Sequence, residues 1–180
     1  PTPLAWGASF DPELVEEMAT QIGGSMRTLG VHMGLAPVLD VIRDPRWGRV
    51  QETYGEDPSL TSRMGISFVR GLQGMDPVIG APLDPKYRKL DATAKHFAVH
   101  SGPEADRHTF DVHPSKQDLY DTYLPAFSGM AKALNATPVE MQQTLSAYLF
   151  GFAFMNLFHG ALADSFGSRP VVLWGIAMFT

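Results

Sequence analysis

The segment 44–57 carries residue types that suit binding of a polyhydroxylated ligand. It combines two arginines, a tryptophan and several carboxylates in one predicted loop. Arginine presents forked N–H donors to hydroxyl groups, and an exposed Trp47 would offer an apolar face to a sugar ring. A surface loop of salt-bridged charges is the alternative interpretation. The residues concerned are Asp44, Arg46, Trp47, Arg49, Glu52, Glu56 and Asp57.

A second polar pair, Lys95 and His96, interrupts an apolar segment at 92–99. A charged lysine in a strand that is buried on both faces is costly unless it is paired or functional. Barrels of alternating strands and helices place their active sites at the carboxyl ends of the strands. We therefore interpret the pair as ligand-binding. A histidine satisfied by a backbone carbonyl and a lysine at a sheet edge are the alternative.

A third polar cluster lies in the segment 101–108. Gly102 and Pro103 predict a turn that holds Glu104, Asp106 and Arg107. An ordinary solvated turn is the alternative to a ligand-binding loop.

Metal and cofactor sites are not predicted. His96 and His100 have the spacing of helical zinc ligands, but four residues of a strand span about 13 Å, which is too far for one ion. A His-Glu-x-x-His motif is absent. The chain has no cysteine, which excludes disulfides, thiolate nucleophiles and cysteine-based zinc sites.

The elements that must position these clusters form an alternating pattern. Helical periodicity predicts helices over 11–29, 57–73 and 114–127, and Asp-Pro pairs open the first two. Short apolar runs at 34–42 and 92–99 predict buried strands, each followed by a polar loop. The fold class is therefore α/β with parallel strands.

Charge and the N-terminal sequence restrict the class of protein further. A net charge of −5 argues against a nucleic-acid partner. The first 13 residues lack a basic region followed by an apolar core, so they do not form a signal peptide. They predict an extended, proline-rich segment, and we expect the chain to begin inside a larger protein.

Residues 1–127 resemble glycoside hydrolase family 3, most closely its bacterial β-glucosidases and β-xylosidases. The matching segments are 34–65, 95–111 and 113–127. The resemblance implies the first part of a (β/α)₈ (TIM) barrel, and a parent hydrolase that is periplasmic or secreted. It also implies a subsite for the terminal β-glucoside or β-xyloside sugar. The residues that would hydrogen-bond the sugar hydroxyls are Arg49, Lys95, His96 and Arg107.

The same resemblance implies where the catalytic pair lies. Family members are retaining enzymes that use two carboxylates, a nucleophile and an acid/base. The nucleophilic Asp belongs to a later barrel strand and the acid/base Glu to a following domain, so both are expected outside these 180 residues. Glu52, Glu104 and Asp106 are therefore not assigned catalytic roles. We expect sugar binding without glycosidase turnover and no cofactor.

The second half of the chain has a different character. Residues 141–163 contain no charge, and the apolar run 144–162 is long enough to cross a bilayer core of about 30 Å. A loop at 163–170 follows, and then a second apolar run, 171–180, which is too short to span. These features predict an α-helical transmembrane segment with the lipid bilayer as its partner.

Residues 128–180 resemble the major facilitator superfamily, specifically its drug-resistance branch. The branch has a Gly/Asp/Arg loop between its second and third spans, which is matched here by Gly160, Asp164, Gly167 and Arg169. Ser165 and Ser168 replace two expected basic residues. The resemblance implies an inner-membrane location for this part and a fragment of a drug-efflux transporter.

The two resemblances meet at residues 121–127, which fit both families. Natural fusions more often join whole domains through a flexible linker. We therefore predict two parts, 1–127 and 128–180, joined as a chimera of two gene fragments. A genuine membrane-tethered sugar-binding protein is the alternative. Long sequencing reads that carry one uninterrupted frame through the joint would exclude the chimera.

Overall fold

The computed structural model describes residues 1–76, 78–79, 81–134, 164–167 and 170. The chain divides into two compact units, Pro1–Asn135 and Ala136–Thr180. In the second unit, residues 164–166 are helical and residues 164–167 are all exposed. Gly167 has a φ of 82°, a left-handed conformation that favours glycine. The predicted span at 144–162 and the loop residues Gly160 and Arg169 lie outside the described residues.

Two long helices confirm the periodicity of the sequence. Helix α2 is Pro12–Thr28 and helix α3 is Pro58–Gln73. Each begins after an aspartate whose side chain accepts a hydrogen bond from the third residue along, Asp11 from Leu14 N at 3.0 Å and Asp57 from Leu60 N at 2.7 Å. Proline follows each cap, where its missing N–H costs nothing. Helix α3 ends at the left-handed Gly74.

Two strands pair in parallel, as the alternating pattern predicts, but they are much shorter than the predicted 34–42 and 92–99. Strand β1 is Met33–Gly34 and strand β2 is Asp91–Ala92, with Met33 opposite Asp91. Farther along the same two segments, an isolated parallel bridge joins Val38 to Lys95. Pro37 lies between these pairings and has no N–H to donate to the ladder. The predicted strands are wrong in length because this proline interrupts regular pairing.

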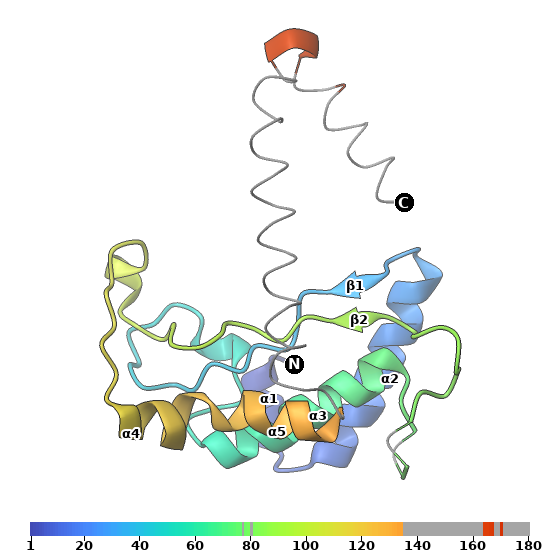
Figure 1. The fold of residues 1–180 in the computed structure, drawn as a ribbon, viewed down its shortest axis with the longest axis horizontal. Coiled ribbons are helices and arrows are strands. Elements are labelled where there is room, and N and C mark those ends of the chain that lie inside the picture. Colours follow the sequence, from blue (N-terminus) through green and yellow to red (C-terminus); the bar gives the residue numbers. More distant parts are fainter. Residues whose placement is uncertain (77, 80, 135–163, 168–169, 171–180) are drawn as a thin grey trace. The chain divides into compact units, whose positions relative to one another are not determined.

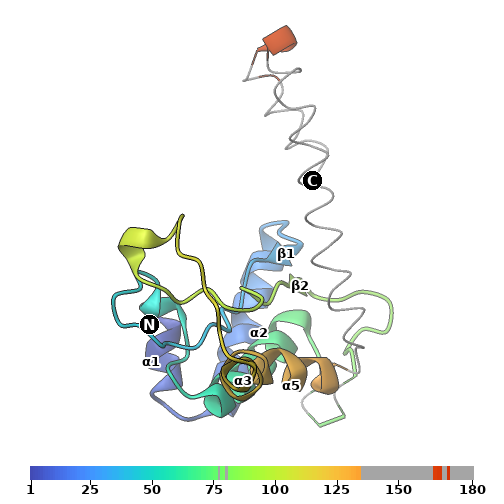
Figure 2. The same ribbon diagram turned by 60° about the vertical axis from the view of Figure 1, so that its left-hand side comes forward.

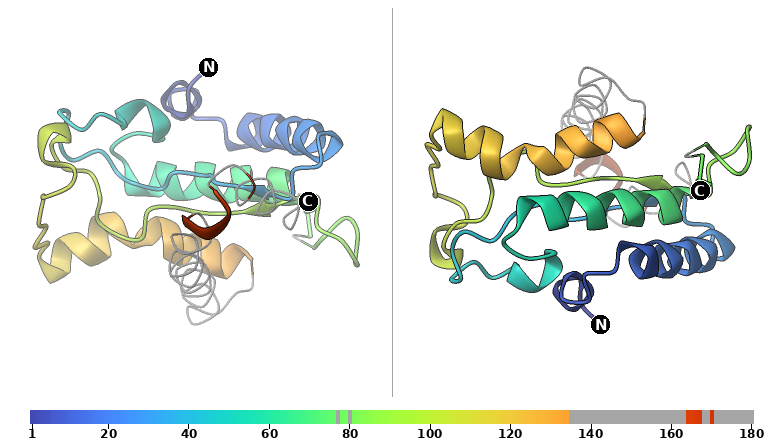
Figure 3. Two further views of the ribbon diagram at one scale, coloured as in Figure 1. Left: turned by 90° about the horizontal axis from the view of Figure 1, so that it is seen from above. Right: turned by 90° about the horizontal axis from the view of Figure 1, so that it is seen from below.

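The strands and helices form two layers in the first unit (Figures 1 and 2). Helices α2, α3 and α5 (Pro125–Ala133) lie on one side of the strand pair, with α3 between the other two (Figure 3). Strand β1, helix α3 and strand β2 thus form one β-α-β unit. The core of this unit contains the buried side chains of Val15, Ala19, Leu39, Val41, Met64, Phe68, Val69, Leu72, Leu90, Phe127 and Met130.

The short elements contain two corrections to the sequence prediction. The N-terminal segment was predicted to be extended, but Pro3–Gly7 forms helix α1. The predicted helix 114–127 is interrupted: α4 (Lys116–Asp118) leads into a wide π-helical turn, η3 (Leu119–Tyr123), before α5. Pro125 lacks the N–H that a regular helix requires, which explains the break. The predicted division at 127–128 falls within α5.

No helix in the described part of the chain is both long and apolar enough to cross a membrane.

Candidate functional site

Four polar side chains form a continuous chain of hydrogen bonds beyond the ends of the paired strands. Asp40 Oδ2 lies 2.7 Å from His96 Nδ1, and His96 Nε2 lies 2.9 Å from Arg49 Nη1. Arg49 also holds Glu52 through two bonds of 2.7 Å, from Nε and Nη2. Arg49 and Glu52 belong to the short 3₁₀ helix η1 (Val50–Glu52) and its N-terminal cap. The structure therefore brings two predicted sugar-binding residues, Arg49 and His96, into direct contact.

The charged groups in this row of hydrogen bonds stabilise one another. The hydrogen bonds from Arg49 lower the pKa of Glu52, with a smaller contribution from the charge of Lys95. The same bonds raise the pKa of Arg49. Glu52 is therefore an ionised carboxylate that fixes the guanidinium, and a forked guanidinium–carboxylate pair is geometrically specific. This places Glu52 as a support for Arg49.

Asp40 was missed by the sequence reasoning. It is buried, with 2% of its surface exposed, and both its side-chain contacts are to His96. The available signal was an acid near the end of an apolar run predicted to be a strand. Residues at such positions lie at the face of a barrel that carries the active site.

The structure corrects the environment that was predicted for Lys95. It was predicted to lie in a strand buried on both faces, but its side chain is partly exposed. Within the described residues it has no ion-pair partner within 4.0 Å, although its charge contributes to the lowered pKa of Glu52. Its ammonium is thus available to a ligand beside the Arg49–His96 pair.

Glu104 joins the first and third polar clusters. Its Oε2 accepts from Gly48 N at 3.0 Å, and its own N–H donates to Arg46 O at 3.1 Å. Its other carboxylate oxygen pairs with Arg107. Glu104 begins the 3₁₀ helix η2 (Glu104–Asp106). The carboxylate therefore fixes the position of Arg107, the fourth predicted sugar-binding residue, relative to the loop that carries Arg49.

Substituting Gly48 by alanine is expected to weaken this connection. A Cβ at Gly48 would lie 2.5 Å from the Glu104 carboxylate, so the flexible glutamate must move away and lose the Gly48 hydrogen bond. We expect sugar affinity to fall by about three- to tenfold, the equivalent of about 1 kcal/mol, because Arg107 stays in place but is held less firmly. Calorimetric titration with methyl β-D-glucoside measures the affinity.

The control is Gly24→Ala, because nothing lies within 4 Å of a Cβ at Gly24. Gly55→Ser is unsuitable as a control because Gly55 has a φ of 121°, which strains any side chain. Unchanged affinity in Gly48→Ala would contradict the connection.

His100 lies against His96, with ring centroids 4.4 Å apart. This corrects the prediction that strand geometry separates the two histidines by about 13 Å, because the chain at this point is not a regular strand. Even so, the described residues contain no group of three or more histidine, aspartate or glutamate side chains arranged to hold a metal ion.

Acidification is expected to destabilise the fold through His100. Burial, followed by the charge of His96, lowers the pKa of His100 below 6.5. The unfolded chain then binds more protons than the folded one, so the free energy of unfolding decreases as the pH falls below about 6.5. Thermal midpoints at several pH values check this. His100→Gln should flatten the profile in this range, whereas His108→Gln, at an exposed position, should keep it. Identical profiles for wild type and His100→Gln would disprove the assignment.

Trp47 does not offer a face to a sugar ring, contrary to the prediction. Its side chain is 3% exposed and packs edge-on against His100, with ring centroids 5.8 Å apart. Together with Arg107 and Phe110, the two rings line a small hollow of about 40 Å³. Trp47 is therefore part of the support beneath the polar cluster.

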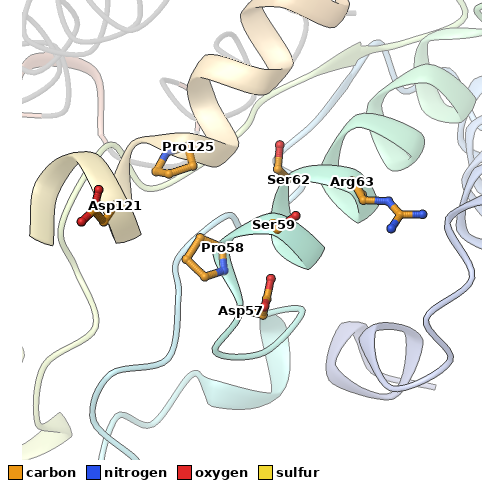
Figure 4. Close-up of a pocket in the computed structure, with 7 residues that line it drawn as sticks. All are labelled: Asp57, Pro58, Ser59, Ser62, Arg63, Asp121 and Pro125. Carbon is orange, nitrogen blue, oxygen red and sulfur yellow. The ribbon is translucent and has the colours of Figure 1, made fainter.

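A larger open hollow of about 390 Å³ lies at the start of α3. Figure 4 shows Asp57, Pro58 and Ser59 on one side of it and Asp121 and Pro125 on the other. None of the predicted sugar-binding residues lines this hollow.

Two family patterns match the chain. The Glycosyl hydrolase family 3 N terminal domain matches residues 1–141, and the Major Facilitator Superfamily matches residues 119–180. The two matches share residues 119–141, which include the segment 121–127 that the sequence identified as common to both.

Known proteins resemble the first and larger part. A xylan 1,4-β-xylosidase from Xylanibacter ruminicola is 45% identical over an alignment of 164 positions, and the match covers 82% of this chain and 18% of that protein. The crystal structure of a β-glucosidase from Listeria innocua is 40% identical with a TM-score of 0.62, over 74% of this chain and 18% of that one. A family 3 exo-β-xylosidase structure is 30% identical with a TM-score of 0.63, over 72% and 17%.

This chain spans less than a fifth of the length of each of these relatives. The matching family pattern is that of an N-terminal domain, and the solved relatives are glycosidases of TIM-barrel-type fold. Because the family pattern covers residues 1–141 of 180, the chain belongs to glycoside hydrolase family 3.

Proposed function

We propose that this chain is a fragment of a retaining β-glycosidase that binds a terminal β-D-glucosyl or β-D-xylosyl residue. The observation that carries the proposal is the direct Arg49–His96 contact, which joins the segments that follow the two parallel strands. The ligand-binding groups are Arg49, Lys95, His96 and Arg107.

The chemistry of these groups suits hydroxyl recognition. Arg49, Lys95 and Arg107 only donate hydrogen bonds, whereas a neutral His96 also accepts one. A sugar hydroxyl both donates and accepts, so a donor-rich site with one acceptor fixes its orientation. Relatives named as β-xylosidases and β-glucosidases support both sugars as candidates. In the parent enzyme, a nucleophile and an acid/base outside these residues would cleave the glycosidic bond.

A binding titration of the full chain with methyl β-D-glucoside and methyl β-D-xyloside tests the proposal. Lys95→Ala is expected to lower the affinity about tenfold, because a charged donor is lost. Lys86→Ala removes a lysine that lies over the Tyr87 ring in an exposed loop and should leave the affinity unchanged. Equal affinities of the two variants, or no binding by the wild-type chain, would reject the site.

A second candidate function concerns the C-terminal part. The match of residues 119–180 to the major facilitator pattern supports a transporter fragment in a chimeric chain. We propose that this part inserts in the inner membrane and that the parent hydrolase is periplasmic or secreted. The loop motif Gly160, Asp164, Gly167 and Arg169 would belong to that part. Asp164 and Gly167, the two described members, are exposed.

Two measurements test this second candidate. Insertion of residues 128–180 into proteoliposomes, followed by protease digestion, should protect the segment 144–162. Complete digestion would reject the span. Long sequencing reads through the source locus test the chimera separately, because a single uninterrupted frame would show that the fusion is genuine.

A further inference from the structure

We propose that Asp40 is a positioning residue that fixes His96 as a hydrogen-bond acceptor for a ligand hydroxyl. The inference rests on the proposed sugar site and adds a residue and a direction of hydrogen bonding to it. Three features of Asp40 carry the argument: its burial, its two contacts with His96, and an oxygen without a partner.

The burial of Asp40 has no evident structural benefit. Its side chain is 1% exposed, and Oδ1 has no hydrogen-bond partner among the described residues. A buried carboxylate with an unpartnered oxygen destabilises a fold relative to a well-packed apolar residue. Oδ2, in contrast, accepts from both Nδ1 and the backbone N–H of His96, at 2.7 and 3.1 Å. Both hydrogen bonds that this carboxylate accepts within the described residues therefore come from a single residue.

The partners of His96 determine which ring nitrogen carries the proton. A carboxylate only accepts hydrogen bonds, so Nδ1 must be the donor to Asp40. A guanidinium only donates, so Nε2 must accept from Arg49. Both contacts require the same neutral tautomer, with the proton on Nδ1 and a lone pair on Nε2.

This lone pair accepts from Arg49 Nη1, the guanidinium nitrogen that does not hold Glu52, so a bound hydroxyl would insert between these two atoms. A ligand hydroxyl can donate its proton to His96 Nε2 while its oxygen accepts from Arg49. Without Asp40, only the contact with Arg49 still favours a proton on Nδ1. The other tautomer then becomes populated, and in it two donors face each other across the site. Asp40 therefore acts through His96 and does not touch the sugar.

Nitrogen-15 spectra of the full chain test the tautomer directly, without ligand, at a pH where His96 is neutral. We expect a protonated Nδ1 and an unprotonated Nε2 in the wild type. Adding methyl β-D-glucoside should shift Nε2 and leave Nδ1 protonated. A wild-type tautomer with the proton on Nε2 overturns the proposal. The ligand-free spectrum decides this even if no sugar binds, in which case only the proposed function fails.

Variants separate a positioning role from a structural one. Asp40→Asn keeps an oxygen that accepts both His96 N–H groups, so tautomer and affinity should be retained to within about threefold. Asp40→Ala should populate both tautomers and weaken sugar binding by at least about tenfold. Asp44→Asn, at a carboxylate that pairs with Arg46, is the matched control. Loss of the Nδ1 proton in Asp40→Asn overturns the proposal, and so does an unchanged tautomer in a folded Asp40→Ala. If Asp40→Ala does not fold, the wild-type spectrum and the Asp40→Asn spectrum still test the proposal.

Discussion

Replacing Gly71 by alanine is expected to lower the free energy of unfolding by about 1–3 kcal/mol, the usual effect of overpacking a core. Gly71 lies in α3 where this helix crosses α2. A Cβ there would overlap the backbone oxygen of Glu16 and lie 2.9 Å from the Ala19 Cβ and from Thr20 N. Backbone atoms cannot swing aside as a long side chain can, so the two helices must separate. Urea unfolding of the full chain, followed by circular dichroism, measures the loss.

The control for this prediction is Gly24→Ala in α2. Nothing lies within 4 Å of a Cβ at Gly24, so only helix propensity changes. Alanine is favoured over glycine inside a helix by about 0.8–1 kcal/mol, which predicts a more stable protein. The same substitution thus has opposite signs at the two positions. A stabilising Gly71→Ala would show that α2 and α3 are not in close backbone contact.

The helices could be predicted because their ends are encoded locally. Asp11-Pro12 and Asp57-Pro58 supply a cap and a proline suited to the first turn, and Gly74 supplies a left-handed end. The positions of the strands could be predicted from the sequence, but their lengths could not. Apolar runs show where backbone is buried, whereas strand length depends on hydrogen bonds between segments some 57 residues apart, such as Val38 with Lys95.

The polar clusters of the candidate site could be recognised from residue type, and the family resemblance selected four residues among them, whose sugar binding stays a prediction. Arg49, Lys95, His96 and Arg107 are charged or polar groups in conspicuous clusters. Their supports are less visible, because Asp40 and Glu104 act through contacts across 56 residues of sequence. Trp47 shows the converse error: an aromatic residue in a polar loop predicts an exposed stacking surface, but long-range packing buries it.

The joint between the two family matches shows a similar limit. Residues 119–141 fit both patterns, yet α5 runs without interruption from Pro125 to Ala133. Its Ala126, Phe127 and Met130 are buried in the first unit. The first compact unit therefore continues beyond residue 127, because α5 packs into it past the last residue that the family resemblance identified.

Replacing Arg49 by lysine is expected to reduce the affinity for methyl β-D-glucoside by about ten- to a hundredfold, the effect of one or two charge-assisted hydrogen bonds. Charge is kept, but the planar fork is lost. One ammonium cannot hold both Glu52 oxygens and also reach His96, as Arg49 does through Nε, Nη2 and Nη1. Calorimetric titration measures the change, with circular dichroism to confirm folding.

Arg46→Lys is the matched control, three residues away in the same loop. Arg46 also forms a forked pair, with Asp44, but its side chain is 73% exposed. Exposed ion pairs contribute little, about 0–1 kcal/mol, so this variant should bind sugar as the wild type does. Comparable losses in both variants would mean that the loop needs arginine for its general structure. A loss of sugar affinity in Arg49→Lys alone would mean that the guanidinium fork, which joins Glu52 to His96, positions this loop for sugar binding.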